Sequence, residues 1–473
     1  MPLPRLTPII LAIALFMERM DSTIIATSLP AIAADIGTSP IALKLAVTSY
    51  LVALAVFIPI SGWMSDRFGA LNIFRIAIGV FMIGSIGCAF SGSIGAFVFW
   101  RLVQGAGGSM MTPVSRLLLV RGTPKHQLVD ALAWLTIPAL VGPILGPPVG
   151  GFFTTYLSWH WIFWINVPIG IAGIILVTRL LPPVEPREPK PLDFTGFFLS
   201  GIGFSAFVFG ISVVSLPALP MYYGYTTIAI GILMGIAYLW HAKRTEHPLL
   251  DPRMFRYPIF RASIVGASNF RMGLGALPFL MPLMLQLGFG MSALGSGLIT
   301  FSSAVGALLM KTMAQRITRR YGFRNLLVWN TLVSSLALIA CGLLRPAVPS
   351  LLIILFLLIT GFFRSLEFTC VNTLAFADVE EADMSQATSF SSTAQQLALS
   401  IGIGIASQTL NLSLAGRHAT VLGLPDFTAA FCTVGLISLS AMLSFRRLAP
   451  DAGSSVSGHR MALADMPVRT THP

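Results

Sequence analysis

The stretch VGPILGPPVGG, residues 141–151, combines regularly spaced glycines with prolines. Gly142, Gly146 and Gly150 recur every four residues, so they would form one smooth helix face that lets a neighbouring backbone approach closely. Pro143 and Pro147 each remove a backbone hydrogen bond, which allows the helix to bend. A helix that is merely well packed would explain the glycines better than the paired prolines. We therefore predict a smooth, bendable helix that can slide against its neighbours.

The composition of the whole chain places this helix in a membrane. The 473 residues are 55% hydrophobic and 10% charged, with a mean hydropathy of +0.81, whereas soluble domains carry about 25% charged residues. The net charge of +12 comes from basic residues that gather in short connections between apolar runs. This is typical of cytoplasmic loops that face anionic lipid. The sequence therefore predicts an all-α polytopic membrane protein that interacts with membrane lipids and not with nucleic acid.

Fourteen apolar segments are long enough for membrane-spanning helices, each of which needs about 20 residues. We expect a six-helix bundle over residues 1–181, linkers with an inserted helix pair over 182–258, a second six-helix bundle over 259–450, and a disordered cytoplasmic tail over 451–473. The expected helices are 9–30, 41–63, 72–92, 95–118, 129–152, 161–181, 194–214, 224–241, 259–287, 291–313, 324–344, 348–375, 391–413 and 427–446.

The distribution of charge and a weak internal repeat support this topology. An even number of helices with both termini in the cytoplasm places most basic connections inside, as the positive-inside rule requires. SDRFGALNIF, residues 65–74, and TRRYGFRNLL, residues 318–327, are similar and occupy equivalent positions in the two blocks of six helices. Repeated six-helix halves with a central site between them are typical of secondary transporters.

Three charged side chains interrupt the first apolar segment, in LFMERMDSTII, residues 15–25. Ionisable residues within membrane helices are costly and usually mark a proton, ion or substrate pathway. Glu18 and Asp21 are three residues apart and share a helix face. Two neighbouring carboxylates in a poorly hydrated site titrate as a pair, which suits a proton carrier. We predict that this pair of carboxylates carries protons, while Arg19 steadies a neighbouring helix or attracts an anion.

The connection after the second expected helix reads GWMSDRFGALNIFR, residues 62–75. Gly62 would permit close approach of backbones. Asp66, near the start of the third helix, and Arg67 would lie in a tight loop, with Gly69 free to take a positive φ. An ordinary charged loop would look the same. The stretch resembles the loop signature G-x-x-x-D-R-x-G-R-K of the major facilitator superfamily, although Ala-Leu replaces its basic pair. The resemblance implies a gating loop.

Two further stretches strengthen this resemblance. RLVQGAGGSMMTPVSR, residues 101–116, places Arg101 inside the fourth helix with Gln104 one turn further on the same face. It resembles the superfamily's fourth-helix motif, in which the arginine is linked to proton transfer. The alternative is that Arg101 lies near the helix end and snorkels to the interface. The stretch from Gly142 through Gly151 fits the antiporter signature of drug exporters, G-x-x-x-G-P-x-x-G-G.

Other segments are similar to signatures of the fourteen-helix drug:proton antiporter family, namely MDSTIIATSLPAIAADIG, residues 20–37, and SWHWIFWINVPIG, residues 158–170. The resemblance implies that Asp21 is the proton carrier, and we predict that Glu18 modulates the pH dependence of transport. In the later half, Arg364 and Glu367 are three residues apart and can pair on one helix face, either within the substrate cavity or as a structural pair. The candidates for the substrate cavity are Arg19, Gln104, Arg271, Arg364, Glu367 and Gln395.

No Walker A loop, H-E-x-x-H or G-x-S-x-G motif occurs in the sequence, so we expect no enzyme activity, no cofactor and no metal. The family resemblance implies a proton-coupled antiporter, a monomer in the bacterial inner membrane, that exports drug-like small molecules. In the expected helices of this chain, arginines outnumber acidic residues. This balance favours a second possibility, the export of organic anions or small carboxylates. A sensor or scaffold that does not transport would need a soluble output domain, for which we find no segment.

Overall fold

The computed structural model describes residues 3–123, 128–181, 191–214, 221–380 and 383–454, which form helices and no strand. The linker residues 182–190 and most of the predicted tail, residues 455–473, lie outside this description. Eleven helical segments within the described residues are long and apolar enough to cross a membrane. The fold is therefore all-α and polytopic, as predicted. The first helix, α1, is not among the eleven, because three charged side chains interrupt its apolar sequence.

The longer elements correspond one by one to the fourteen expected helices, although several ends lie a few residues further out. In chain order they are α1 (Leu3–Ile24), α3 (Lys44–Phe57) with α4 (Ser61–Phe68), α5 (Ala70–Ala89), α6 (Ile94–Gly122), α7 (Leu128–Tyr156), α8 (Trp161–Trp164) with α9 (Asn166–Leu180), α10 (Phe194–Val214), α11 (Met221–Arg244), α12 (Pro258–Leu283), α13 (Ala293–Tyr321), α14 (Phe323–Cys341), α15 (Ser350–Leu374), α16 (Met384–Gly416) and α17 (Leu424–Arg446).

The first expected helix, 9–30, is wrong as a single helix. After α1 the chain makes a 3-10 turn, η1 (Ile25–Thr27), and continues as the short helix α2 (Leu29–Ile36). Pro30 lies in the first turn of α2, where a proline needs no hydrogen-bond partner for its nitrogen. The turn at η1 thus separates α1 from α2. It lies at the end of the molecule where the two bundles meet.

The predicted loop around Asp66 is also wrong. Asp66 and Arg67 belong to the last turns of α4, which extends the second helix to Phe68, and the connection to α5 is Gly69 alone. Gly69 has a φ of 85°, and Gly322 between α13 and α14 has a φ of 70°. Both positions need glycine because other residues rarely adopt a positive φ. The two similar sequence stretches thus make the same one-residue turn in the two halves.

In the part of the chain that the structure describes, the helices pack as two groups whose hydrophobic cores merge at one end only. Near η1, buried residues of both groups form one cluster, which joins Ile24, Leu29 and Phe163 with Leu280 and Phe431. At the other end each group has a separate core, around Phe74 and Phe81 in the first and around Phe323 and Phe445 in the second. The halves are therefore closed against each other at the η1 end.

Among the described residues, two hydrogen bonds join the halves at this closed end. The Gln286 side chain donates from Nε2 to the carbonyl oxygen of Thr27 over 2.9 Å. The backbone nitrogen of Leu294, at the start of α13, donates to Oγ1 of Thr155 over 3.1 Å. Along the seam, α7 packs against α13 and α3 packs against α16.

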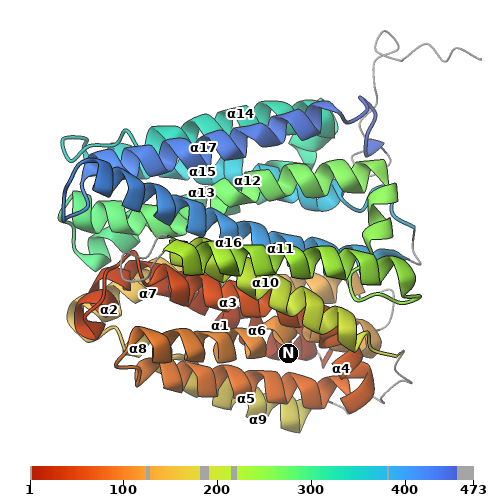
Figure 1. Cartoon of the computed structure of the whole chain (residues 1–473). Helices are drawn as coiled ribbons and strands as arrows, with labels where there is room; N and C mark the ends of the chain where they lie inside the picture. Colours follow the sequence, from red (N-terminus) through yellow and green to blue (C-terminus); the bar gives the residue numbers. More distant parts are fainter. Residues whose placement is uncertain (1–2, 124–127, 182–190, 215–220, 381–382, 455–473) are drawn as a thin grey trace, which may run out of the picture.

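The inserted pair, α10 and α11, lies across the front of both groups in Figure 1, where it is drawn in yellow-green and green. The α10 helix packs against α11, α3 and α16. Its start is fixed by Asp193, whose Oδ1 accepts a hydrogen bond from the Gly196 nitrogen over 2.7 Å and lies 2.7 Å from Nε2 of His241 on α11. The pair is thus attached to one bundle through α3 and to the other through α16.

Candidate functional site

Asp21 is the centre of a buried polar cluster inside the first group of helices. Its side chain is fully buried on α1. Oδ2 accepts a hydrogen bond from Nη1 of Arg101 on α6 over 2.7 Å, which makes a buried ion pair. Oδ1 accepts from Nδ2 of Asn166 and from Nε2 of Gln104, each over 2.9 Å. Both carboxylate oxygens therefore have partners, as a buried charge requires.

Ser85 on α5 completes the cluster. Its Oγ accepts hydrogen bonds from the same two amides, from Asn166 over 2.9 Å and from Gln104 over 3.2 Å. It donates to the carbonyl oxygen of Phe163 over 3.0 Å. The helix is interrupted at Ile165, between α8 and α9, and Asn166 therefore lies at the start of α9, within reach of Asp21. Four long helices, α1, α5, α6 and α9, thus supply one connected network.

Arg101 does not snorkel, so that alternative is wrong. The side chain is 1% exposed and its guanidinium lies 4.4 Å from the centroid of the Tyr50 ring. Its Nη1 also donates to Oε1 of Gln104 over 2.7 Å. An arginine in this position needs the Asp21 carboxylate because an uncompensated buried charge is strongly destabilising.

Glu18 is held more loosely than Asp21, although it is only 3% exposed. Its Oε1 accepts a hydrogen bond of 3.4 Å from the Tyr50 hydroxyl of α3. Its Oε2 lies 3.1 Å from Nε of Arg19, but without the alignment of a hydrogen bond. The Arg19 side chain is 38% exposed. Tyr50 connects this carboxylate to Arg101, because the same ring contacts the Arg101 guanidinium.

The glycine face of α7 packs against the helix that carries Asp21. A side-chain carbon added at Gly142 would lie 2.9 Å from backbone atoms of Phe16 and Met20, and one added at Gly150 would overlap the Ile24 carbonyl. Gly146 faces Thr23 in the same way. These contacts explain why the stretch has glycine at every fourth position.

The opposite side of α7 meets the second bundle. Gly151 faces the backbone of Ala293 and Leu294 on α13, and Gly297 of α13 faces the Pro147 carbonyl. The helix is continuous from Leu128 to Tyr156, through Pro143, Pro147 and two further prolines. Helix α7 therefore contacts α1 on one side and α13 of the second bundle on the opposite side.

The predicted gating residues lie at the end of the molecule where the cores are separate. Arg67 is exposed and Asp66 is half-buried at the end of α4. The expected close approach at Gly62 is wrong, because a side-chain carbon added there would meet nothing within 4 Å. Gly62 is exposed, so the neighbouring helices pack through other residues of α4.

In the second bundle, the expected pairing of Arg364 with Glu367 is not formed. Glu367 is fully buried and accepts hydrogen bonds of 2.6 Å from Nδ2 of Asn330 and from Oγ1 of Thr331, both on α14. Arg364 is half-buried and lines a cavity of about 20 Å³ with Ser334 and other residues. Helix spacing permits the pair, but the polar groups of α14 occupy both carboxylate oxygens.

Arg271 on α12 is 2% exposed, and its partners are neutral. Its Nη2 donates to Oδ1 of Asn372 on α15 over 2.5 Å, and its guanidinium lies 5.2 Å from the centroid of the Phe368 ring. Within the described part of the chain, no carboxylate lies in ion-pair distance of Arg271 or Arg364. Gln395 is half-buried on α16. The buried arginine of the first bundle is thus neutralised, whereas that of the second is not.

The sequence singled out Asp21, Gln104 and Arg101, and the structure brings them together. It did not identify Asn166, Ser85 or Tyr50 as members of the site. Asn166 and Ser85 are polar residues within apolar helices, which is the signal that could have found them. Tyr50 gives no such signal, because tyrosine is common in membrane helices near the interfaces.

Known proteins resemble the chain over nearly its whole length. The family model described as Major Facilitator Superfamily matches residues 11–403 and 264–462. The protein named "Putative multidrug resistance protein MdtD" is 33% identical over 459 residues, which cover 94% of this chain and 96% of the relative, both in Yersinia pestis (strain Pestoides F) and in Yersinia pseudotuberculosis serotype O:1b (strain IP 31758).

Solved structures show the same fold. A peptide transporter of the POT type, in complex with alafosfalin, matches with a TM-score of 0.68 at 15% identity and covers 94% of each chain. A D-xylose-proton symporter matches with a TM-score of 0.66 at 16% identity and covers 94% of this chain and 98% of its own. With the family model and the relatives, this shows that the chain belongs to the Major Facilitator Superfamily and is a membrane transporter of small molecules rather than an enzyme.

Proposed function

We propose that this chain is a proton-coupled antiporter that exports drug-like small molecules by alternating access. The observation that supports this most directly is the buried ion pair between Asp21 and Arg101, within one network that connects α1, α5, α6 and α9. A charged pair in a membrane helix bundle is costly and is usually retained for function. The multidrug resistance name of the relatives supports drug-like compounds as the substrate.

In this proposal, Asp21 carries the proton. When Asp21 is ionised, Arg101, Gln104 and Asn166 hold its carboxylate. A proton on Oδ2 would remove the attraction to Arg101, since a neutral carboxyl no longer balances the guanidinium. Arg101 could then shift toward the Tyr50 ring, which already contacts it. The two protonation states therefore favour different positions of α6 relative to α1, which is the coupling that an antiporter needs.

The closure at the η1 end supports alternating access. The structure has one shared core there and two separate cores at the end that carries α4. We infer that the α4 end faces the cytoplasm of a bacterial cell, with both termini on that side, and that the protein works as a monomer in the inner membrane. The smooth faces of α7 would let α1 and α13 move past it when the closed end changes.

The proposal is tested by transport into everted membrane vesicles, with and without an imposed pH gradient. We expect gradient-driven uptake of a drug-like substrate by the unaltered protein and none by Asp21→Asn. A matched control is Asp35→Asn, because the Asp35 side chain is 57% exposed. Uptake that ignores the gradient, or normal coupled uptake by Asp21→Asn, would refute the proton-carrier role.

A second candidate function is the export of organic anions such as small carboxylates. It is favoured by Arg271, a buried cation whose partners in the described residues are Asn372 and the Phe368 ring. A substrate carboxylate would supply the missing negative charge. Competition between organic anions and lipophilic cations in a binding assay separates the two functions. Arg271→Gln would weaken the binding of anions alone if this second function holds.

A further inference from the structure

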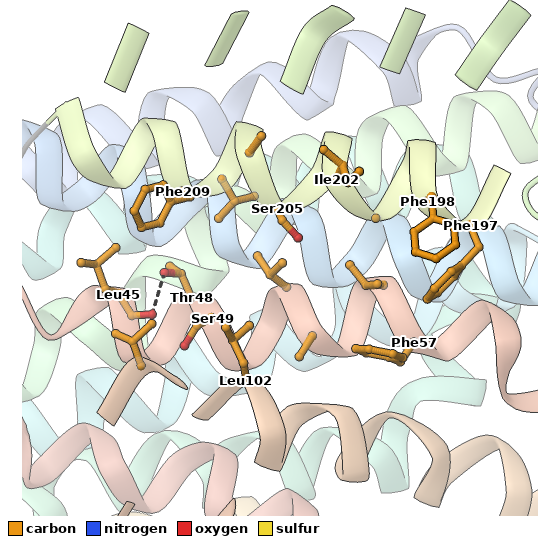
Figure 2. Close-up of a pocket in the computed structure, with 17 residues that line it drawn as sticks. Leu45, Thr48, Ser49, Phe57, Leu102, Phe197, Phe198, Ile202, Ser205 and Phe209 are labelled. Carbon is orange, nitrogen blue, oxygen red and sulfur yellow. Dashed lines mark hydrogen bonds between the residues drawn. The ribbon is translucent and has the colours of Figure 1, made fainter. Parts of the chain in front are cut away.

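A cavity of about 620 Å³ lies outside the Asp21 cluster, between α3, α6 and the inserted helix α10. Figure 2 shows α10 above it and α3 below it, with Leu102 of α6 at the lower edge. The volume is within the range of ligand-binding pockets, about 300–1,000 Å³. This is a large space to leave between helices that otherwise pack closely, because protein interiors have few voids.

The wall of this cavity is apolar. None of its seventeen lining residues is charged, and aromatic rings, among them Phe57, Phe197 and Phe209, close its two ends. The hydroxyls of Thr48 and Ser49 donate within their own helix, to the carbonyl oxygens of Lys44 and Ala46 over 2.9 and 3.0 Å. The cavity therefore suits a ligand that brings no charge.

The cavity opens toward the lipid. Several of its lining side chains are largely exposed on the outer surface of the helices: Leu102 is 38% exposed, Phe198 59%, Ile202 49% and Phe209 47%. In a membrane this surface is in contact with the bilayer. A molecule dissolved in the bilayer can thus enter from the side, between α10 and α6, without passing through water.

The shape of the cavity indicates which bilayer molecule it takes. The space runs along the helix axes from Phe197 to Phe209, twelve residues of helix or about 18 Å. One leaflet of the hydrocarbon core is about 15 Å thick, half of the full core. Because the helices cross the membrane, a cavity of this length and direction matches a hydrocarbon chain of one leaflet.

We propose that this cavity is a lipid-binding site that holds one hydrocarbon chain of a membrane phospholipid. The site lies beside the seam between the two bundles. At one end of the cavity, the Phe57 and Phe197 rings lie 5.9 Å apart between centroids and connect α10 with α3. Near its other end, Ile211 of α10 lies against Gly404 of α16. The bound chain fills the space between α3 and α10, so that the inserted pair stays attached to both bundles while α3 moves against α16.

The test is photocrosslinking in liposomes that contain phosphatidylcholine with a diazirine midway along one acyl chain. After irradiation, the adducts on the full-length protein are mapped by mass spectrometry. We expect adducts on Val52 and Ala53 of α3, which are only 5% and 2% exposed. Leu233 of α11, which is 60% exposed, reports ordinary contact with the bilayer. Adducts on Leu233 without any on Val52 or Ala53 would overturn the proposal.

Two matched substitutions in the inserted pair refine the test. Ala206→Phe on α10 fills the cavity and should abolish the adducts on α3, whereas Ala229→Phe on the exposed face of α11 should leave them unchanged. If Ala206→Phe does not fold, the labelling of the unaltered protein still decides. A free, uncharged lipophilic compound is added as competitor. If it removes the α3 adducts and leaves those on Leu233, the labelled chain had occupied a saturable site in the cavity, as proposed. Adducts on α3 that persist undiminished in Ala206→Phe would overturn the proposal.

Discussion

Asp21 on α1 and Arg101 on α6 are 80 residues apart in the chain, yet Oδ2 of one and Nη1 of the other lie 2.7 Å apart. Neither charge is tolerable in this position without the other, because removing one partner of a buried pair leaves the second uncompensated. The pair therefore has a structural role as well as the proposed role in proton coupling. The two roles can be separated by experiment.

Asp21→Asn should lower the free energy of unfolding by about 3–5 kcal/mol, because Arg101 then remains buried without a counter-charge. The double variant Asp21→Asn/Arg101→Gln should regain much of this stability but no coupled transport. Denaturation of the purified protein in detergent measures the first effect and vesicle transport the second. Equal stability of the single and double variants would contradict the pairing.

Glu18→Gln should change the pH dependence of transport and leave the maximal rate largely intact. Glu18 is adjacent to the Asp21 cluster, with Tyr50 and Arg19 as its own partners. Its charge should therefore affect the protonation of Asp21 through space. The measurement is the transport rate as a function of pH. Tyr50→Phe, which removes the hydroxyl donor, should change the profile further, and an unchanged profile in both variants would exclude a modulating role.

Gly150→Ala should reduce both stability and transport, since the added methyl group would overlap the Ile24 carbonyl of α1. Overpacking of this kind costs about 1–3 kcal/mol. Gly79→Ala on α5 is the control, because the same methyl group there would meet nothing within 4 Å. Thermal denaturation and vesicle transport should both distinguish the two variants; equal behaviour would mean that α1 and α7 adjust freely.

Gln286→Ala should favour opening at the η1 end, because it removes the hydrogen bond from Nε2 to the Thr27 carbonyl. The loss of one hydrogen bond is worth about 1 kcal/mol, roughly a fivefold change in a two-state population. Distances between spin labels on α2 and on the chain after α12 would report the shift. Gln386→Ala, which removes a bond to the Pro248 carbonyl at a site remote from η1, is the control.

Glu367→Gln should have a smaller effect than Asp21→Asn. Glu367 connects α15 to α14 through Asn330 and Thr331, and an amide keeps the hydrogen bond from one of these donors. We expect a loss of about 1–2 kcal/mol in stability with coupled transport retained. Complete loss of transport in a stable variant would instead give Glu367 a direct role in transport.

The sequence was sufficient for features that depend on neighbouring residues. Apolar segments of the right length predict helices because a bilayer leaves no other partner for backbone groups. Gly69 was expected to take a positive φ, and it does, as does Gly322 in the similar stretch of the second half. The charged side chains of α1 and α6 stood out because such residues are rare in membrane helices.

Only the tertiary structure decided which polar groups meet. Helix spacing permitted a pair between Arg364 and Glu367, but Asn330 and Thr331 of another helix bind the carboxylate instead. Similarly, Asn166 donates to Asp21 and to Ser85, although these three residues are spread over 145 positions of the chain. Local sequence determines where a helix forms and what it carries, whereas partners across helices depend on how those helices pack, which no short stretch of sequence specifies.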